Sequence, residues 1–292
     1  MTPAVVVVGD VATDVVVVLA GEPAPGSDRP AAISTRGGGA AANVAAHLAR
    51  LGVSVELAGC VGDDPPAAGL AAELTAAGVR LALRTVPGVP TGTIVSLVEP
   101  GGQRSFLADR GANLALLAGD VPAPSAGGHL YVSGYTLLDP RPRDAGLHAL
   151  RAAVAAGCTV SVDPASTGPL AEYGVDRWLA DTGGATLLLP NADEARLLTG
   201  CRDVEEAARA LARGYPVVAL KLGADGALWA AGDVLVHRPA HPTTVVDTTG
   251  AGDAFAAGLL SAWLRAPEGD PAAALDAGLA RAAAVVRQPG AR

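Results

Sequence analysis

The chain has 292 residues, of which 50% are hydrophobic and 17% charged, and its formal net charge is -8. This length and composition predict a globular fold with one large core and argue against extended disorder. The arginines that carry nearly all of the positive charge are scattered along an acidic chain, so a nucleic-acid partner is not expected.

The start of the chain alternates between strand-forming and helix-forming residues. Two valine-rich runs at residues 4–8 and 15–19 predict short buried strands. A triple glycine at residues 37–39 then precedes an alanine-rich stretch at residues 40–51, whose composition is helical. The order strand, loop, helix is typical of an α/β protein.

Residues 53–107 predict a change of architecture. A strand at 53–58 and a helix at 66–77 continue the first pattern, but the strand-forming runs at 79–86, 91–98 and 104–107 have no helix between them. Neighbouring runs of this kind form hairpins, so we expect a small antiparallel sheet to project from the domain here.

From residue 129 the alternation of strands and helices returns. Strands are predicted at 130–132, 158–162, 186–189 and 217–220, a hairpin at 226–236, and helices at 144–156, 192–198, 204–212, 251–264 and 272–287. Asp270 followed by Pro271 is typical of the start of a helix and begins the last one. Repeated strand–helix units predict a mostly parallel sheet that is covered by helices on both faces.

Cysteine usage and the start of the chain bear on where the protein resides. Cys60, Cys158 and Cys201 are far apart and form no Cys-x-x-Cys pair, which suits a reducing compartment. The first residues lack a basic leader, and Asp10 and Asp14 interrupt the apolar runs too early for a secretory core or a membrane span. We therefore expect a cytoplasmic protein without a membrane partner.

The string DTTGAGDAF at residues 247–255 joins a β-branched run to a predicted helix. Its small residues Gly250, Ala251 and Gly252 let backbone amides approach a ligand, and a helix N-terminus offers unpaired N–H groups with partial positive charge. We expect a transferring phosphoryl group to bind there, beside Asp253 as the base that takes a proton from an attacking hydroxyl. For GAGD alone, a tight turn with an acidic side chain near the helix dipole is the structural alternative.

The whole nine-residue string resembles the C-terminal signature of the ribokinase-like carbohydrate kinases, the PfkB family. GGGAAAN at residues 37–43 resembles the family's N-terminal signature, which holds the acceptor sugar. Gly38 and Gly39 permit close backbone approach to a polar ring, and the Asn43 amide both donates to and accepts from hydroxyls. Asp14 matches the family's carboxylate for sugar hydroxyls. For the glycine segment the structural alternative is a loop that starts a helix. For Asp14 it is a polar residue on an exposed strand face.

Two motifs in the second half match the family's nucleotide site. Asn191 and Glu194 match its Asn-x-x-Glu motif, which implies that Glu194 places Mg²⁺ largely through water, although the pair also fits a helix capping box. Lys221 and Gly223 follow a strand where the family contacts the nucleotide, with a strand-terminal turn as the alternative. Lys221 is the only lysine of the chain, which excludes a Walker-type phosphate loop. Residues 109–113 fit a substrate contact or a surface turn.

The resemblance spans essentially the whole chain and implies a doubly wound α/β fold, in a single domain over residues 1–292, with a β-sheet lid from segments near 12–35 and 79–110. It implies ATP and Mg²⁺ as cofactors and K⁺ in a loop shaped by Asp247 and Thr249. As in many relatives, a homodimer through paired lids is an expectation. Ala40 replaces a lysine of ribokinases, and a substrate-contacting glutamate is replaced near Gly134 and Tyr135, which argues against a strict ribokinase.

We therefore expect an ATP-dependent kinase that phosphorylates a hydroxyl of a small sugar or sugar acid. The first alternative is a nucleoside kinase of the same fold, acting for instance on pseudouridine or adenosine. An apolar wall beside the acceptor would favour it, whereas the aromatic content of 3% favours plain sugars. A dinucleotide-dependent oxidoreductase is a further alternative, but the sequence has no Gly-x-Gly-x-x-Gly fingerprint after the first strand. The last alternative is a non-catalytic sugar- or nucleotide-binding protein, which would not need the base and the glycines that are present here.

Overall fold

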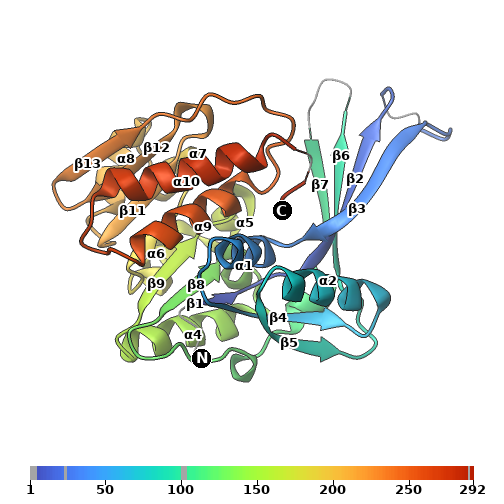
Figure 1. Cartoon of the computed structure of the whole chain (residues 1–292), viewed down its shortest axis with the longest axis horizontal. Helices are drawn as coiled ribbons and strands as arrows, with labels where there is room; N and C mark the ends of the chain where they lie inside the picture. The colour runs from blue at the N-terminus through green and yellow to red at the C-terminus, as the bar shows by residue number, and fades with distance from the viewer. Residues whose placement is uncertain (1–4, 23–24, 100–103, 289) are drawn as a thin grey trace.

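The computed structural model describes residues 5–22, 25–99, 104–288 and 290–292. Its main sheet has nine strands in the spatial order β13-β12-β11-β10-β9-β8-β1-β4-β5 (Figure 1). The strands from β11 to β5 run parallel, and β12 and β13 are antiparallel additions at one edge. These strands are β1 (Val5–Val8), β4 (Val55–Gly62), β5 (Arg80–Val86), β8 (His129–Ser133), β9 (Thr159–Asp163), β10 (Leu187–Leu188), β11 (Val217–Lys221), β12 (Ala227–Ala231) and β13 (Val234–Arg238).

Helices cover both faces of the main sheet, as predicted. Side chains alternate along β1, so that Val5 and Val7 pack into one hydrophobic core and Val6 and Val8 into the other. The helices over the first core are α1 (Ala40–Arg50), α2 (Pro65–Ala76), α9 (Ala251–Trp263) and α10 (Pro271–Val285). Those over the second are α3 (Gly134–Leu138), α4 (Arg143–Ala155), α5 (Thr167–Tyr173), α6 (Val175–Thr182), α7 (Ala192–Thr199) and α8 (Val204–Leu211).

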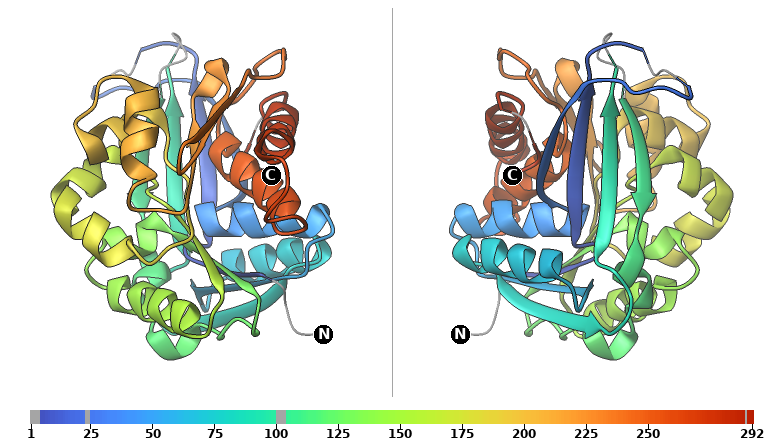
Figure 2. Two further views of the ribbon diagram at one scale, coloured as in Figure 1. Left: turned by 90° about the vertical axis from the view of Figure 1, so that its left-hand side faces the viewer. Right: turned by 90° about the vertical axis from the view of Figure 1, so that its right-hand side faces the viewer.

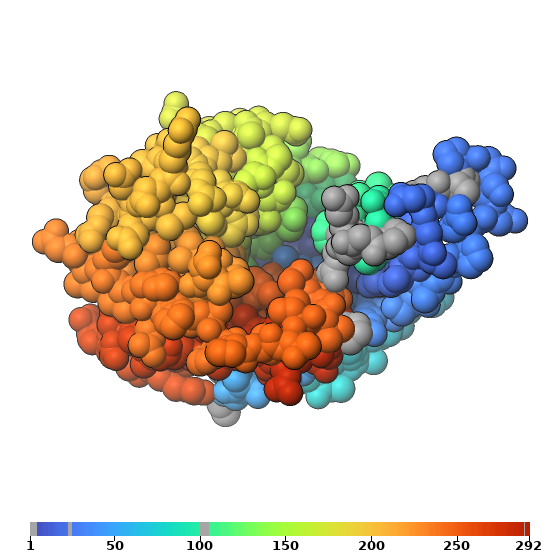
Figure 3. Space-filling model, turned by 90° about the horizontal axis from the view of Figure 1, so that it is seen from above, coloured from blue at the N-terminus to red at the C-terminus, as the bar shows by residue number. Residues whose placement is uncertain are grey.

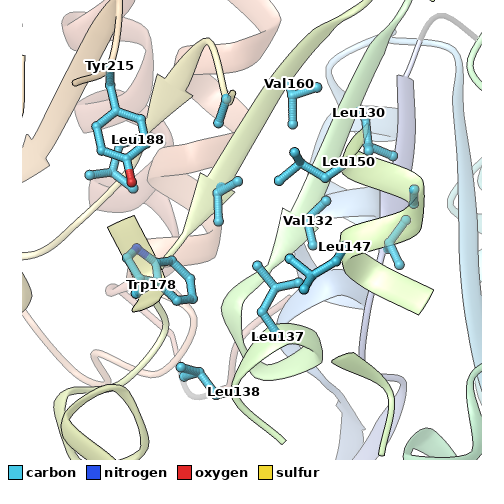
Figure 4. Close-up of a cluster of buried hydrophobic side chains, with 14 of the residues drawn as sticks. Leu130, Val132, Leu137, Leu138, Leu147, Leu150, Val160, Trp178, Leu188 and Tyr215 are labelled. Atoms are coloured by element: carbon cyan, nitrogen blue, oxygen red, sulfur yellow. The ribbon is translucent and has the colours of Figure 1, made fainter. Parts of the chain in front are cut away.

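The second core is filled by large side chains from strands and helices alike. Figure 4 shows Leu130 and Val132 of β8 facing Leu147 and Leu150 of α4, with Trp178 of α6 on the far side. Three short 3₁₀ turns, η1 (Gly111–Ala115), η2 (Ala118–Asp120) and η3 (Gly223–Asp225), complete the helical elements of the described residues. Within that part of the chain, none of the helices is both long and apolar enough to cross a membrane.

A second sheet of four strands stands away from the main body and forms a lid (Figures 1 and 2). Its strands are β3 (Ala31–Gly38), β2 (Ala12–Leu19), β6 (Gly92–Val98) and β7 (Arg104–Asp109), in that spatial order. β3 runs through Gly39 directly into α1, so the triple glycine joins the lid to the main body. Any ligand bound at these glycines therefore lies at the junction of the two sheets.

Residues 31–38, for which no element was predicted, form strand β3. The structure corrects three predictions for this region. The run at 79–86 becomes β5, which pairs in parallel with β4 in the main sheet and so lies outside the lid. The lid is also not purely antiparallel, because β2 pairs in parallel with β6. The segment at 15–19 lies in β2 and is half-exposed rather than buried.

Candidate active site

Helix α9 begins at Ala251 and places Asp253 in its first turn, as predicted. Gly250 caps the helix in the left-handed conformation at φ 73°, where glycine is strongly favoured. The Ala251 amide donates to the Thr248 carbonyl at 3.2 Å, whereas no backbone carbonyl among the described residues accepts from the amides of Gly250, Gly252 or Asp253. These three amides, two of which belong to the predicted set, therefore remain open to an anion.

Asp253 meets the glycine-rich segment through one hydrogen bond. The Asn43 Nδ2 donates to Asp253 Oδ2 at 2.8 Å, and Asn43 itself is only 4% exposed. Burial raises the pKa of Asp253 to about 7, although this hydrogen bond acts to lower it. The Asn43 Oδ1 has no hydrogen-bond partner among the described residues, so it can accept a bond from a ligand hydroxyl.

Asp14 lies in β2 against the two glycines that the sequence singled out. A Cβ at Gly38 would overlap the Asp14 carboxyl group, and a Cβ at Gly39 would overlap the Asp10 carbonyl, so neither position admits a side chain. Gly39 also has φ 91°, which favours glycine. Burial raises the pKa of Asp14 to about 6, with Arg292 acting in the opposite direction. The structure thus brings Asp14, the glycines and Asn43 together on the lid side of Asp253.

On the other side of Asp253, two parallel strands contribute an ion pair. The Lys221 Nζ at the end of β11 donates to Asp163 Oδ2 at the end of β9, at 2.6 Å. Burial disfavours the ammonium, but Asp163 and Glu194 hold the pKa of Lys221 above its ordinary value. The sequence predicted Lys221 as a site residue but not Asp163, because an aspartate between a strand and Pro164 has the features of an ordinary turn.

Asn191 and Glu194 form the predicted capping box at the start of α7. The Asn191 Oδ1 accepts from the Glu194 amide at 2.9 Å, and the Asn191 amide and side chain donate to the two Glu194 oxygens, both at 2.8 Å. Glu194 is 1% exposed, and burial raises its pKa to about 7. Across the described ranges, no three His, Cys, Asp or Glu side chains are arranged to hold a metal ion directly.

Two cavities adjoin at Lys221, Gly223 and Gly252. One has a volume of about 380 Å³ and is polar, with Asp163, Asn191, Glu194 and Asp253 in its wall. The other has a volume of about 470 Å³ and is apolar. Its wall includes Val245, Phe255, Leu279, Ala282, Ala283 and Val286. A charged group with an attached flat apolar body, as in a nucleotide, fits this pair of cavities. The α10 residues of this wall were not predicted as site residues from the sequence, because small apolar residues on a helix are typical of a core.

Residues 109–113 do not form a surface turn. The Arg110 guanidinium binds both carboxylate oxygens of Asp10, at 2.7 and 2.8 Å, and lies 3.6 Å from Asp139. Asn113 is buried and exchanges two hydrogen bonds of 2.9 Å with the backbone of Val11. This network fixes the link between β1 and β2 and hence the position of the lid relative to the main body.

The last residues of the chain connect the two loops of the site. The Gly290 amide donates to Asp247 Oδ2 at 3.0 Å, and the Thr249 amide to Asp247 Oδ1 at 2.7 Å. The Ala291 carbonyl accepts from His47 Nε2 at 2.9 Å, and Arg292 Nη2 donates to the Gly38 carbonyl at 2.9 Å. Residues 290–292 therefore couple the loop before α9 to the glycine segment before α1.

Known proteins resemble this chain in sequence and in fold. The sequence profile described as "pfkB family carbohydrate kinase" matches residues 2–292. A fructokinase of Klebsiella pneumoniae is 36% identical over 237 residues, which cover 77% of this chain and 76% of that protein.

Two solved structures have the same architecture. An adenosine kinase from Sinorhizobium meliloti superimposes with a TM-score of 0.88 at 25% identity, over 100% of this chain and 96% of that one. A fructokinase double mutant from Vibrio cholerae O395, bound to fructose, ADP and potassium ion, gives a TM-score of 0.83 at 27% identity, over 100% and 95% of the two chains. The similar proteins thus include kinases of a sugar and of a nucleoside.

Proposed function

The chain belongs to the pfkB family of carbohydrate kinases, and we propose that Asp253 is the base with which it transfers the γ-phosphoryl group of ATP to a hydroxyl of a sugar-containing acceptor. One observation carries this proposal. The Asp253 carboxylate lies in the wall of the polar cavity and is also bonded to Asn43, so it stands between the side that suits a nucleotide and the side that suits a sugar.

The proposed reaction is an in-line displacement. The acceptor oxygen forms a bond to the γ-phosphorus while its proton passes to the Asp253 carboxylate, and the bond to the leaving oxygen breaks so that ADP departs with the electron pair. The open amides of Gly250, Gly252 and Asp253 donate to the phosphoryl oxygens, where negative charge gathers. A base with a pKa of about 7 can take up this proton and release it again near neutral pH.

We place the phosphates next to Lys221. Its ammonium is charged, only partly exposed and in the polar cavity, and ATP offers it an anionic partner in exchange for Asp163. Before the nucleotide binds, Asp163 keeps Lys221 charged and in position. Gly223 and Asn191 border the same cavity, which supports their assignment to the nucleotide site.

Mg²⁺ fits the Asn191–Glu194 corner of the polar cavity through water. Both Glu194 oxygens already accept bonds from Asn191, but each retains a lone pair for a water molecule of the ion. Mg²⁺ neutralises phosphate charge when it is bound. For a monovalent cation, we propose the loop at Asp247 and Thr249, which residues 290–292 hold against the site.

The acceptor site is proposed on the lid side of Asp253. The Asp14 carboxylate accepts hydrogen bonds from ring hydroxyls, and the Asn43 Oδ1 accepts one more. Gly38 and Gly39 allow the ring to approach the backbone. We also propose a homodimer through the outward face of the lid, where Ile33 is 67% exposed, and residence in the cytoplasm, where the three free thiols stay reduced.

An assay of ADP release tests the proposed reaction. Mg-ATP is supplied with pentoses, hexoses, sugar acids and nucleosides, one at a time, and the product is examined by phosphorus NMR. We expect acceptor-dependent ADP release with one new phosphate monoester for each ADP formed. ADP release that is independent of every acceptor, or without a new monoester, would show that the polar cavity supports only hydrolysis.

A further inference from the structure

One face of the lid continues the proposed acceptor site. Asp14 and Val16 are two residues apart in β2, so their side chains share a face of the sheet. Strand register places Ile94 and Ser96 of β6 beside them, and Phe106 of β7 beside Ser96. We call Val16, Ile94, Ser96 and Phe106 the inner lid face.

The inner lid face is turned toward the main body. Arg36 pairs with Asp14 across β2 and β3 and therefore lies on the same face. A Cβ built on Gly290, which belongs to the main body, would lie 2.8 Å from Arg36 Nη1. The opposite face of the lid is exposed toward the viewer in the right-hand view of Figure 2, and Figure 3 shows the lid projecting from the body when it is seen from above.

Phe106 is an unusual residue to expose on this face. The chain has two phenylalanines, and the other one, Phe255, is 3% exposed, whereas Phe106 is 57% exposed. Val16 and Ile94 are partly exposed beside it, so together they present an apolar wall. Exposed aromatic side chains next to a binding site are typical of contacts with flat, apolar ligand groups.

The distance from Asp14 to Phe106 determines whether a bare sugar or only a larger acceptor can contact both residues. Strands lie about 4.8 Å apart and rise about 3.3 Å per residue, so Phe106, two strands away from Asp14 and two residues along, is on the order of 12 Å from it. A single sugar ring held by Asp14 and Asn43 does not extend that far. An acceptor with a second ring attached to the sugar does.

We propose that the acceptor is a nucleoside, whose ribose is held by Asp14 and Asn43 and whose base lies against Val16, Ile94 and Phe106. This inference rests on the proposed kinase function and names its substrate class. A nucleobase is flat and apolar on its faces, which suits the partly exposed side chains of this wall. The low aromatic content, which favours plain sugars, is therefore outweighed by where one aromatic residue lies.

The experiment compares acceptors and two neighbouring lid variants. Adenosine, uridine, inosine and pseudouridine are assayed by ADP release beside ribose and fructose, with wild type, Phe106→Ala and Leu107→Ala. Leu107 follows Phe106 in β7, points to the opposite face and is 62% exposed, which makes it a matched control. Light scattering checks that both variants keep the oligomeric state of the wild type.

We expect one nucleoside to exceed ribose in kcat/KM by at least about 100-fold. Phe106→Ala should raise KM for that nucleoside about tenfold or more, as loss of one base–aromatic contact does, with kcat/KM for ribose unchanged. Leu107→Ala should leave both unchanged. A free sugar that is preferred over every nucleoside, or equal effects of the two variants, would overturn the inference while the kinase assignment stands. Absence of any acceptor-dependent ADP release would instead overturn the kinase proposal itself.

Discussion

At the scale of single residues, the candidate site contains three carboxyl groups whose pKa values are raised by burial. Asp253 and Glu194 both have a pKa of about 7, and Asp14 has one of about 6. All three are raised from the ordinary values of these groups because the charged form loses its water. The activity of the enzyme should therefore change near neutral pH rather than near pH 4.

The first prediction concerns the pH profile. A base must be ionised to act, so kcat/KM should rise with pH up to a plateau above about 7. Asn43→Ala removes the hydrogen bond that lowers the pKa of Asp253, and the rise should therefore move to higher pH, in addition to an overall loss of activity. The measurement is kcat/KM from pH 5 to 9 for both proteins. A profile that stays in place would assign the titration to Glu194 or Asp14.

At the scale of elements, the parallel strands explain how distant segments supply one cavity. Asp163 ends β9, Asn191 follows β10, and Lys221 ends β11, and these three strands are neighbours in the sheet. The carboxyl ends of parallel strands meet at the same edge, which is where α/β folds bind ligands. The pair Asp163 and Lys221 is thus a consequence of topology, although 58 residues separate its members.

The second prediction concerns this ion pair. Lys221→Met removes the cation while Asp163 and Glu194 remain, so we expect kcat to fall by about 10² to 10³ and the affinity for ATP to weaken. The pKa of Asp253 should also rise, because Lys221 acts to lower it. Single-turnover rates at pH 6 and pH 8 measure both effects. Lys221→Arg, which keeps the charge, should recover part of the activity, and equal losses in the two variants would contradict a charge-based role.

Much of the element pattern could be predicted from the sequence, and the exceptions have physical causes. The start of α9, the capping box at Asn191 and the glycine segment follow local rules that the sequence displays directly. Strand β3 lacks the alternating buried pattern because the lid leaves it exposed. Strand β5 was assigned to the wrong sheet because a strand's composition does not identify its partner. Asp163 could not be predicted as a site residue, because it meets Lys221 only through the pairing of β9, β10 and β11.

At the scale of the whole molecule, stability and catalysis oppose each other in their response to pH. The buried carboxyl groups of the site, with folded pKa values above the unfolded ones, favour the folded state as the pH falls from 7. Buried histidines act in the reverse sense. His129 of β8 lies between Thr159 Oγ1 and Ser161 Oγ, both at 2.8 Å, and burial lowers its pKa to about 3.

The third prediction isolates this histidine. Because the unfolded state binds a proton below pH 6.5 while the folded state does so only near pH 3, His129 should cost about 2 kcal/mol of the free energy of unfolding between pH 7.5 and pH 5. His129→Gln does not titrate, so the stability difference between wild type and variant should shift by that amount. Urea unfolding at the two pH values measures it. A difference that is independent of pH would mean that the pKa of His129 in the folded protein equals its value in the unfolded chain.

The most direct test of the account is the turnover of Asp253→Asn with the best acceptor, beside wild type and Asp193→Asn. Asp193 is an exposed aspartate next to Glu194 and serves as the matched control. The account predicts that Asp253→Asn binds ATP normally but loses turnover by about 10² to 10⁴, while Asp193→Asn keeps it. Turnover of Asp253→Asn above a few per cent of the wild-type value would contradict the assignment of Asp253 as the base.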